Sequence, residues 1–189
     1  MSADDTAAQH VIAATRSWVE RVVVGLELCP FAKAPHEAGR IRYVVSAARD
    51  IDRLAEDLER ELQTLQAADP AEVETTLLIH PDVLHDFLQY NDFLDVAEQI
   101  VEELDLEGEL QVASFHPDYR FADAPEDDPA NYTNRSPYPM LHLLREASIT
   151  RAVDSLDDPA RIPARNVELL RRLGRKACDA LFRGATAPN

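Results

Sequence analysis

The spacing of apolar residues predicts helices that alternate with short strands. From Val11 onward, apolar positions recur at i, i+4, i+7, i+8 and i+11, which predicts a helix over about residues 5–26. Gly25 and Pro30 end this helix, because proline cannot continue a helix and biases the preceding residue, Cys29, toward extended geometry.

Three short segments rich in β-branched or other apolar residues predict strands. They lie at residues 41–45, 75–79 and 110–115. The second is a continuous apolar run without alternation, which is typical of a central parallel strand that is covered on both faces. Asp50 and Asp82 are suitable N-caps for the two helices between these strands, so the predicted order is β-α-β-α-β.

This order predicts the fold class, because strands that alternate with helices usually pair in parallel through right-handed crossovers. We expect residues 1–189 to form a single α/β domain, a small sandwich with a mainly parallel sheet flanked by helices. Further helices are expected over about 140–149 and 161–183, so that both ends of the chain are helical. Residues 117–137 are rich in prolines, acids and amides, and ordered loops of this length are usually functional.

Composition and charge narrow the class of protein. The 189 residues are 46% hydrophobic and 29% charged, which is enough for an ordinary core. The formal charge of −16 disfavours nucleic acids and anionic membranes as partners. No apolar run approaches the roughly 18 residues that span a membrane, and neither common glycine-rich nucleotide motif is present. The acidic start is unlike a signal peptide, so we expect a cytoplasmic protein.

Basic residues gather near the end of this acidic chain. Residues 161–183 contain seven basic and two acidic side chains. The simplest interpretation is a helix that packs on its own acidic body. The alternative is a surface that binds a partner.

Two histidines mark the ends of predicted strands. His80 and His116 each follow a strand and precede a proline. Ligands of open α/β sheets bind beyond the carboxyl ends of the strands, and neighbouring strands lie about 5 Å apart. We therefore expect the two imidazoles to face one pocket, where they could share a metal, a proton or an anion. The alternative is that each histidine only hydrogen-bonds the adjacent loop.

Cys29 is the candidate thiol, because it follows the first helix where the chain turns toward the sheet. Near an imidazole it could act as a nucleophile or a metal ligand; as a small buried hydrophobe it would have neither role. Cys29, His80 and His116 form the candidate metal set, with His142 as a fourth ligand. Sulfur and imidazole suit zinc or copper better than magnesium or calcium.

A third group of polar residues follows the long loop. Tyr138, His142, Arg145 and Glu146 have the spacing of one helix face. Arginines in so acidic a chain would attract a carboxylate or phosphate, although a plain solvated face is the alternative. The residues predicted to bind substrate are Asn131, Asn134, Arg135, Ser136, Tyr138 and Arg145. The residues predicted to be catalytic are Cys29, His80, His116, Tyr119 and His142.

Several segments together resemble an uncharacterised bacterial family of about this length, a domain of unknown function. They are Trp18 and residues 28–32 (LCPFA), 115–119 (FHPDY), 131–139 (NYTNRSPYP) and 141–146 (LHLLRE). The resemblance covers nearly the whole chain, and the NRSP stretch is quite specific. It implies no activity, but it makes these segments better candidates for a common site.

From these patterns we expect an enzyme that acts on a small polar or anionic metabolite. Its Cys/His/Arg site would lie at the carboxyl edge of the sheet, with residues 117–137 as a lid. Two alternatives stay open. One is a metal-binding or metal-delivery protein that uses Cys29, His80 and His116, and the other is an interaction module that docks a partner without catalysis.

Overall fold

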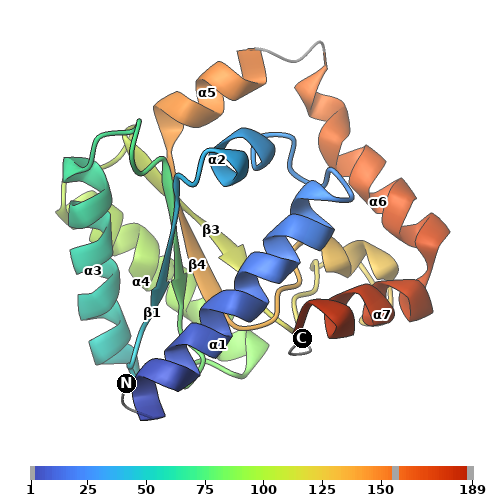
Figure 1. Ribbon diagram of the computed structural model, residues 1–189, viewed down its shortest axis with the longest axis horizontal. Coiled ribbons are helices and arrows are strands. Elements are labelled where there is room, and N and C mark those ends of the chain that lie inside the picture. The colour runs from blue at the N-terminus through green and yellow to red at the C-terminus, as the bar shows by residue number, and fades with distance from the viewer. Residues whose placement is uncertain (1–2, 155–157, 187–189) are drawn as a thin grey trace.

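The computed structural model describes residues 3–154 and 158–186, which form a four-stranded sheet flanked by helices (Figure 1). The strands are β1 (Ile41–Val45), β2 (Thr75–Ile79), β3 (Leu110–Phe115) and β4 (Met140–Arg145). Their order in the sheet is β1-β2-β4-β3. The first three strands lie at the predicted residues, and all five residues of the central strand β2 are buried.

The helices follow the predicted apolar stripes, with differences at their ends. They are α1 (Ala3–Trp18), which continues as the π-helical η1 (Val19–Val24), α2 (Lys33–Glu37), α3 (Ile51–Ala67), α4 (Phe87–Glu103), α5 (Glu146–Asp154), α6 (Ile162–Leu173) and α7 (Arg175–Thr186). Two short 3₁₀ segments are η2 (Pro129–Thr133) and η3 (Pro159–Arg161). In the ranges that the structure describes, no helix is long and apolar enough to cross a membrane.

The sheet is mixed, so the prediction of a mainly parallel sheet is wrong. β1 pairs with β2 in parallel, whereas β4 pairs antiparallel with both β2 and β3. A helix is expected over residues 140–149, but the structure has the strand β4 at residues 140–145. Leucines at 141, 143 and 144 fit either period in so short a run, and pairing on both sides decides in favour of a strand.

Two N-caps were predicted, and one is correct. Asp50 caps α3 by accepting a hydrogen bond from the backbone N–H of Arg53. The cap of α4 is Asp86 instead of Asp82, so this helix begins at Phe87. Leu84 has a φ of 58°, a left-handed conformation that a helix cannot include.

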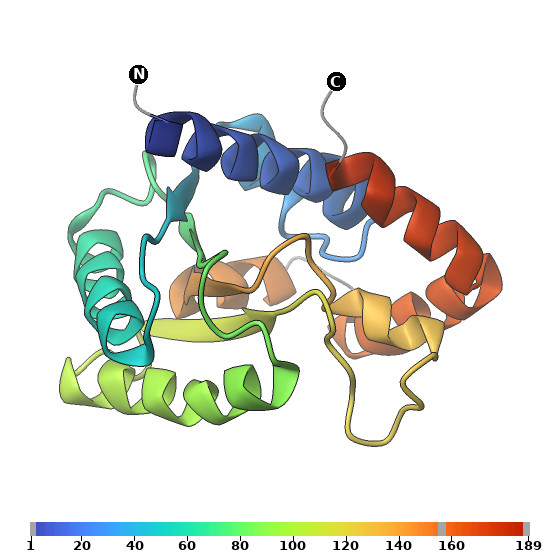
Figure 2. The same cartoon turned by 90° about the horizontal axis from the view of Figure 1, so that it is seen from below.

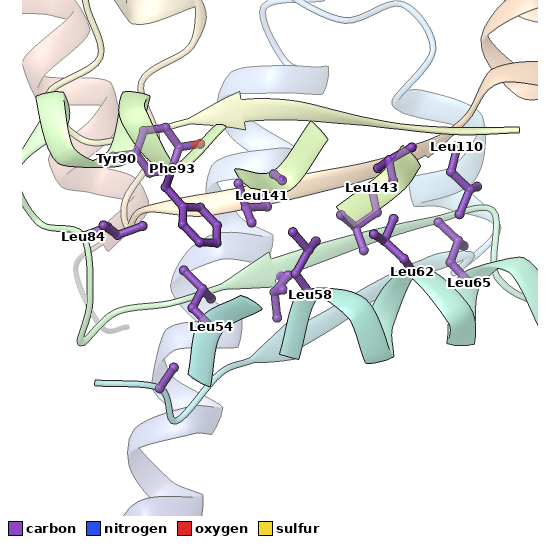
Figure 3. Close-up of a cluster of buried hydrophobic side chains, with 14 of the residues drawn as sticks. Leu54, Leu58, Leu62, Leu65, Leu84, Tyr90, Phe93, Leu110, Leu141 and Leu143 are labelled. Atoms are coloured by element: carbon purple, nitrogen blue, oxygen red, sulfur yellow. The ribbon is translucent and has the colours of Figure 1, made fainter. Parts of the chain in front are cut away.

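The two faces of the sheet are covered by different helices (Figure 2). Under α3 and α4, leucines of α3 and of the sheet pack with Tyr90 and Phe93 of α4 in one cluster (Figure 3). On the other face, α1, η1 and the C-terminal helices pack against a second cluster that includes Trp18, Leu77 and Met140.

The expected C-terminal basic helix is divided in two. Gly174, with a φ of 76°, separates α6 from α7. Arg165 forms an ion pair with Glu27 at 3.0 Å, and Arg171 forms one with Asp128 at 2.6 Å. These pairs join α6 to the turn after η1 and to the long loop, as expected for basic helices that pack on their own acidic body.

Candidate functional site

The predicted site residues lie in three separate places. His80 and His116 lie on the face of the sheet that α3 and α4 cover. The polar residues of 131–136 lie within the long loop. Cys29 and His142 line a cavity on the opposite face of the sheet. The structure therefore brings together Cys29 and His142, but does not join them to the other two histidines.

The aromatic ring of Tyr90 lies between His80 and His116. Its centroid is 5.9 Å from the imidazole of His80 and 5.0 Å from that of His116. The Tyr90 hydroxyl donates to the Met140 carbonyl and accepts from the Phe115 N–H, at 2.9 and 3.0 Å. The two histidines are neighbours of one tyrosine because β4 separates the strands that they follow.

Both imidazoles hold the segment between β2 and α4. Nδ1 of His80 lies 3.0 Å from the Val83 carbonyl, and Nε2 of His116 lies 3.1 Å from the Leu84 carbonyl. The N–H of Asp118 donates to Nδ1 of His116 at 3.0 Å, so His116 has no free nitrogen. This arrangement corresponds to the alternative stated above, in which each histidine hydrogen-bonds the adjacent loop.

Burial keeps both histidines neutral. It lowers the pKa of His80 to about 4 and lowers the pKa of His116 from its ordinary value. Both side chains are fully buried. Nε2 of His80 is also buried and has no hydrogen-bond partner within the described parts of the chain. A charged imidazole in either position would lose its hydration, and at His116 this cost outweighs the favourable charges of Asp118 and Asp86.

The side chains predicted to bind substrate form hydrogen bonds within the long loop and to the end of β3. Asn131 bonds to residues 121, 125 and 126, Asn134 to Ser114, Arg135 to Tyr119 and Glu126, and Ser136 to Tyr138. The guanidinium of Arg135 lies 4.5 Å from the centre of the Tyr132 ring. Tyr119 packs on Phe87 and Phe121. These contacts order the loop, and substrate binding by these residues remains a prediction.

Arg145 lies at the C-terminal end of α3 and does not share a helix face with Tyr138, His142 and Glu146. That expectation is wrong because residues 140–145 form a strand, in which adjacent side chains alternate between the two faces. Nη2 of Arg145 donates to three backbone carbonyls at 2.5 to 3.3 Å. They belong to Leu65, Ala68 and Val73. The guanidinium thus satisfies carbonyls at the end of a helix, which otherwise lack partners.

A cavity of about 330 Å³ lies over the sheet on the α1 face. We call it the Cys29–His142 cavity. Its apolar walls are Trp18, Val19, Phe31, Ala32, Pro35, Ile41, Leu77, Ala113, Phe115, Leu144, Ile149 and Ala152. Its polar side chains are Cys29, Glu74, Thr75, Gln111, His142, Arg145 and Ser148. The cavity extends from the start of β2 to the end of β3 over the face of the sheet, instead of beyond the carboxyl edge as predicted.

His142 has one nitrogen fixed and the other free. The hydroxyl of Thr75 lies 2.6 Å from the Leu143 carbonyl and 2.8 Å from Nε2 of His142. Since this hydroxyl has one proton and donates it to the carbonyl, it must accept a hydrogen bond from Nε2–H of His142. Nδ1 therefore carries the lone pair, and no described residue donates to it. Burial lowers the pKa of His142 to about 4, so the ring is neutral at pH 7.

Cys29 lies in a turn that α6 holds in place. The N–H groups of Leu28 and Cys29 both approach the Val23 carbonyl at the end of η1. Nδ2 of Asn166 in α6 donates to the Leu28 carbonyl at 2.7 Å. Burial raises the pKa of the Cys29 thiol, and hydrogen bonds from the backbone of Phe31 and Ala32 oppose that shift. The thiol is half-buried and protonated at neutral pH.

The predicted metal set is not assembled. Cys29 lies on the α1 face, whereas His80 and His116 lie under α4. Over residues 3–154 and 158–186, no three His, Cys, Asp or Glu side chains gather as they would around a metal ion. The geometry therefore does not support a zinc or copper site formed by Cys29, His80 and His116.

Thr75 orients His142, but no local signal in the sequence marks it as a site residue. Thr75 was only the first residue of a predicted strand, and its partner lies 67 positions away in the sequence. Trp18 was part of the apolar stripe of the first helix and of the resemblance, but it was not named as a site residue. It is 2% exposed, it lines the cavity, and its indole N–H is buried without a partner among the described residues.

The chain belongs to the family described as protein of unknown function (DUF1415), whose family model matches residues 10–180. No curated protein and no solved structure matches the chain. The family resemblance seen in the sequence is thus confirmed. Residues from four of its segments line the cavity: Trp18, Cys29, Phe31, Phe115 and His142.

Proposed function

We propose that the chain is an enzyme whose substrate is a small, neutral and largely apolar molecule bound in the Cys29–His142 cavity. The free Nδ1 of His142 carries this proposal, because a neutral acceptor beside apolar walls suits a ligand that donates one hydrogen bond. Cys29 in the same walls favours an enzyme over a carrier.

The size and walls of the cavity support a small organic ligand. Its volume of about 330 Å³ falls at the lower end of ordinary ligand sites. Most of its wall residues are apolar, so burial of apolar surface would provide most of the binding free energy. The few polar groups would then determine the orientation of the ligand.

The charges around the cavity favour a neutral ligand over the anion expected from the sequence. Arg145, the one arginine among the described wall residues, donates to backbone carbonyls. The carboxylate of Glu74 also lies in the wall, where it pairs with Arg40 at 2.8 Å. An anion in this apolar cavity would therefore lose its hydration beside the Glu74 carboxylate, while the Arg145 guanidinium is already engaged through Nη2 with backbone carbonyls.

Three matched probes test the proposal: benzyl alcohol, toluene and benzoate. All three contain a benzene ring. Benzyl alcohol also has a hydrogen-bond donor, toluene has none, and benzoate carries a negative charge. Binding would be followed by amide chemical shifts of Cys29 and Ala113 in the full chain. We expect benzyl alcohol to bind at least fivefold more tightly than toluene, and benzoate to cause no saturable shift.

The variant His142→Phe identifies the acceptor. It keeps an aromatic ring in the wall but removes Nδ1, so benzyl alcohol should lose its advantage over toluene. His85→Phe is the matched control, because His85 is exposed and lies outside the cavity. Tight binding of benzoate, or an unchanged preference for the alcohol in His142→Phe, would contradict the proposal.

A further inference from the structure

We propose that the Cys29–His142 cavity delivers neutral, apolar electrophiles with an activated carbon–carbon double bond to the thiol of Cys29, which they modify covalently. The ligand class is that of α,β-unsaturated carbonyl compounds. This inference rests on the proposed function, since it requires that the cavity admit small neutral molecules.

Cys29 lies where the cavity meets a hollow at the surface. It belongs to the walls of both. The surface hollow lies between the turn after η1 and α6, with Lys33 and Arg165 among its residues. Cys29 is thus a half-buried wall residue of both the cavity and this surface hollow.

The chain around Cys29 is held by contacts from α6. Nη1 of Arg165 donates to the Glu27 carbonyl at 3.0 Å, and Asn166 bonds the next carbonyl, that of Leu28. Glu27 itself has a φ of 54°, in the left-handed region that non-glycine residues seldom adopt. Two hydrogen bonds from one helix thus fix the turn that presents the thiol.

The addition requires only the groups present. Sulfur forms a bond to the β-carbon, the π-electron pair moves toward the carbonyl group, and the thiol proton ends on the α-carbon. No oxidant, reductant or leaving group is needed. His142 lines the same cavity, and its free Nδ1 can accept the proton in transit.

The cavity should select reagents by charge. Burial disfavours the thiolate of Cys29, and the thiolate is the reactive form. A reagent that attacks from bulk water should therefore react slowly at neutral pH. A neutral electrophile held in the apolar cavity gains from proximity. An anionic electrophile would have to be desolvated near Glu74.

N-ethylmaleimide and 3-maleimidopropionate are a suitable pair of probes, because the same electrophile carries a methyl group or a carboxylate. Their rates would be measured by intact mass in the full chain and divided by their rates with glutathione. We expect Cys29 to prefer N-ethylmaleimide by at least tenfold. Cys29→Ser should remove the adduct, and Cys178→Ser should not, because Cys178 is buried with 1% exposure.

Two further measurements keep the inference falsifiable. Saturating benzyl alcohol should protect Cys29 from N-ethylmaleimide in the unmodified chain. His142→Phe should slow that reaction at least fivefold and slow the reaction of 3-maleimidopropionate by a smaller factor. The inference would be overturned if Cys29 preferred N-ethylmaleimide over 3-maleimidopropionate no more than glutathione does, or if the adduct formed on Cys178.

The outcomes also separate this inference from the proposed function. If benzyl alcohol binds as expected but Cys29 shows no preference between the maleimides, only the inference on Cys29 fails. If no neutral probe binds the cavity and Cys29 reacts equally with both reagents, the proposed function fails as well.

Discussion

The two faces of the sheet each carry buried histidines, but in different states. Under α4, His116 uses both nitrogens and His80 uses one to hold the segment before that helix. On the α1 face, His142 uses one nitrogen to contact Thr75, and the other is free beside a cavity. The position of a histidine at a strand end therefore does not by itself place a free nitrogen next to a cavity.

The two faces also differ in packing density, and the α1 face is the less densely packed of the two. Leu54, Leu58 and Leu62 of α3 are completely buried, and together with the sheet they form a dense core. The α1 face keeps a cavity of about 330 Å³ between its helices and the sheet. Since side chains that line a cavity have fewer packing partners than those of a closed core, the α1 face should contribute less packing energy than the α4 face.

The largest expected effect compares adjacent leucines of β4. Leu143 is fully buried in the dense core, whereas Leu144 is half-buried and lines the cavity. Leu143→Ala should lower the free energy of unfolding by about 2–5 kcal/mol, and Leu144→Ala by less than about 2 kcal/mol. Urea denaturation measures both. Equal losses would mean that the two faces are packed alike.

A smaller effect concerns the dependence of stability on pH. Burial lowers the pKa of His80 and of His142 to about 4, below the ordinary value of 6.5. The unfolded chain then binds more protons than the folded chain between these values, so stability should fall as the pH decreases from about 6.5 to 4. Each histidine contributes at most about 1.4 kcal/mol per pH unit.

The variant His142→Phe isolates the contribution of the α1 face. Its free energy of unfolding, measured by urea denaturation from pH 7 to 4.5, should fall less steeply than that of the unmodified chain. Leu144→Ala is the control, because it alters the same wall without removing a titratable group. The same slope in His142→Phe and in the unmodified chain would show that His142 is not kept neutral by the fold.

The sequence correctly predicted those strands and helix ends that depend only on residues close together in the chain. The three strands at 41–45, 75–79 and 110–115 match the structure, and Asp50 caps its helix as expected. The strand β4 was missed because its pairing with β2 joins residues such as Thr75 and Leu144, far apart in the sequence. Periodicity over six residues has no information about such partners.

Local patterns identified single candidate residues of the site, but they could not show which of these residues lie together. Cys29 and His142 were named as candidates from residue type and position, and they do line one cavity. Their separation from His80 and His116 follows from the insertion of β4 and from the alternation of faces along it. Neither of these features has a local signature.

The smallest expected effect tests the orientation of His142 with two adjacent threonines of β2. Thr75→Val removes the hydroxyl that accepts from Nε2–H and donates to the Leu143 carbonyl, so it should lower the free energy of unfolding by about 1 kcal/mol. Ring nitrogen NMR should then show a mixture of tautomers, and benzyl alcohol should lose part of its advantage over toluene.

Thr76→Val is the control from the opposite face. The Thr76 hydroxyl is fully buried and has no hydrogen-bond partner among the described residues. Replacing it with a methyl group removes an unsatisfied polar group, so this variant should be as stable as the unmodified chain or slightly more stable. It should also keep the single Nε2–H tautomer of His142. If Thr75→Val left that tautomer unmixed, Thr75 would not be the residue that keeps Nδ1 free.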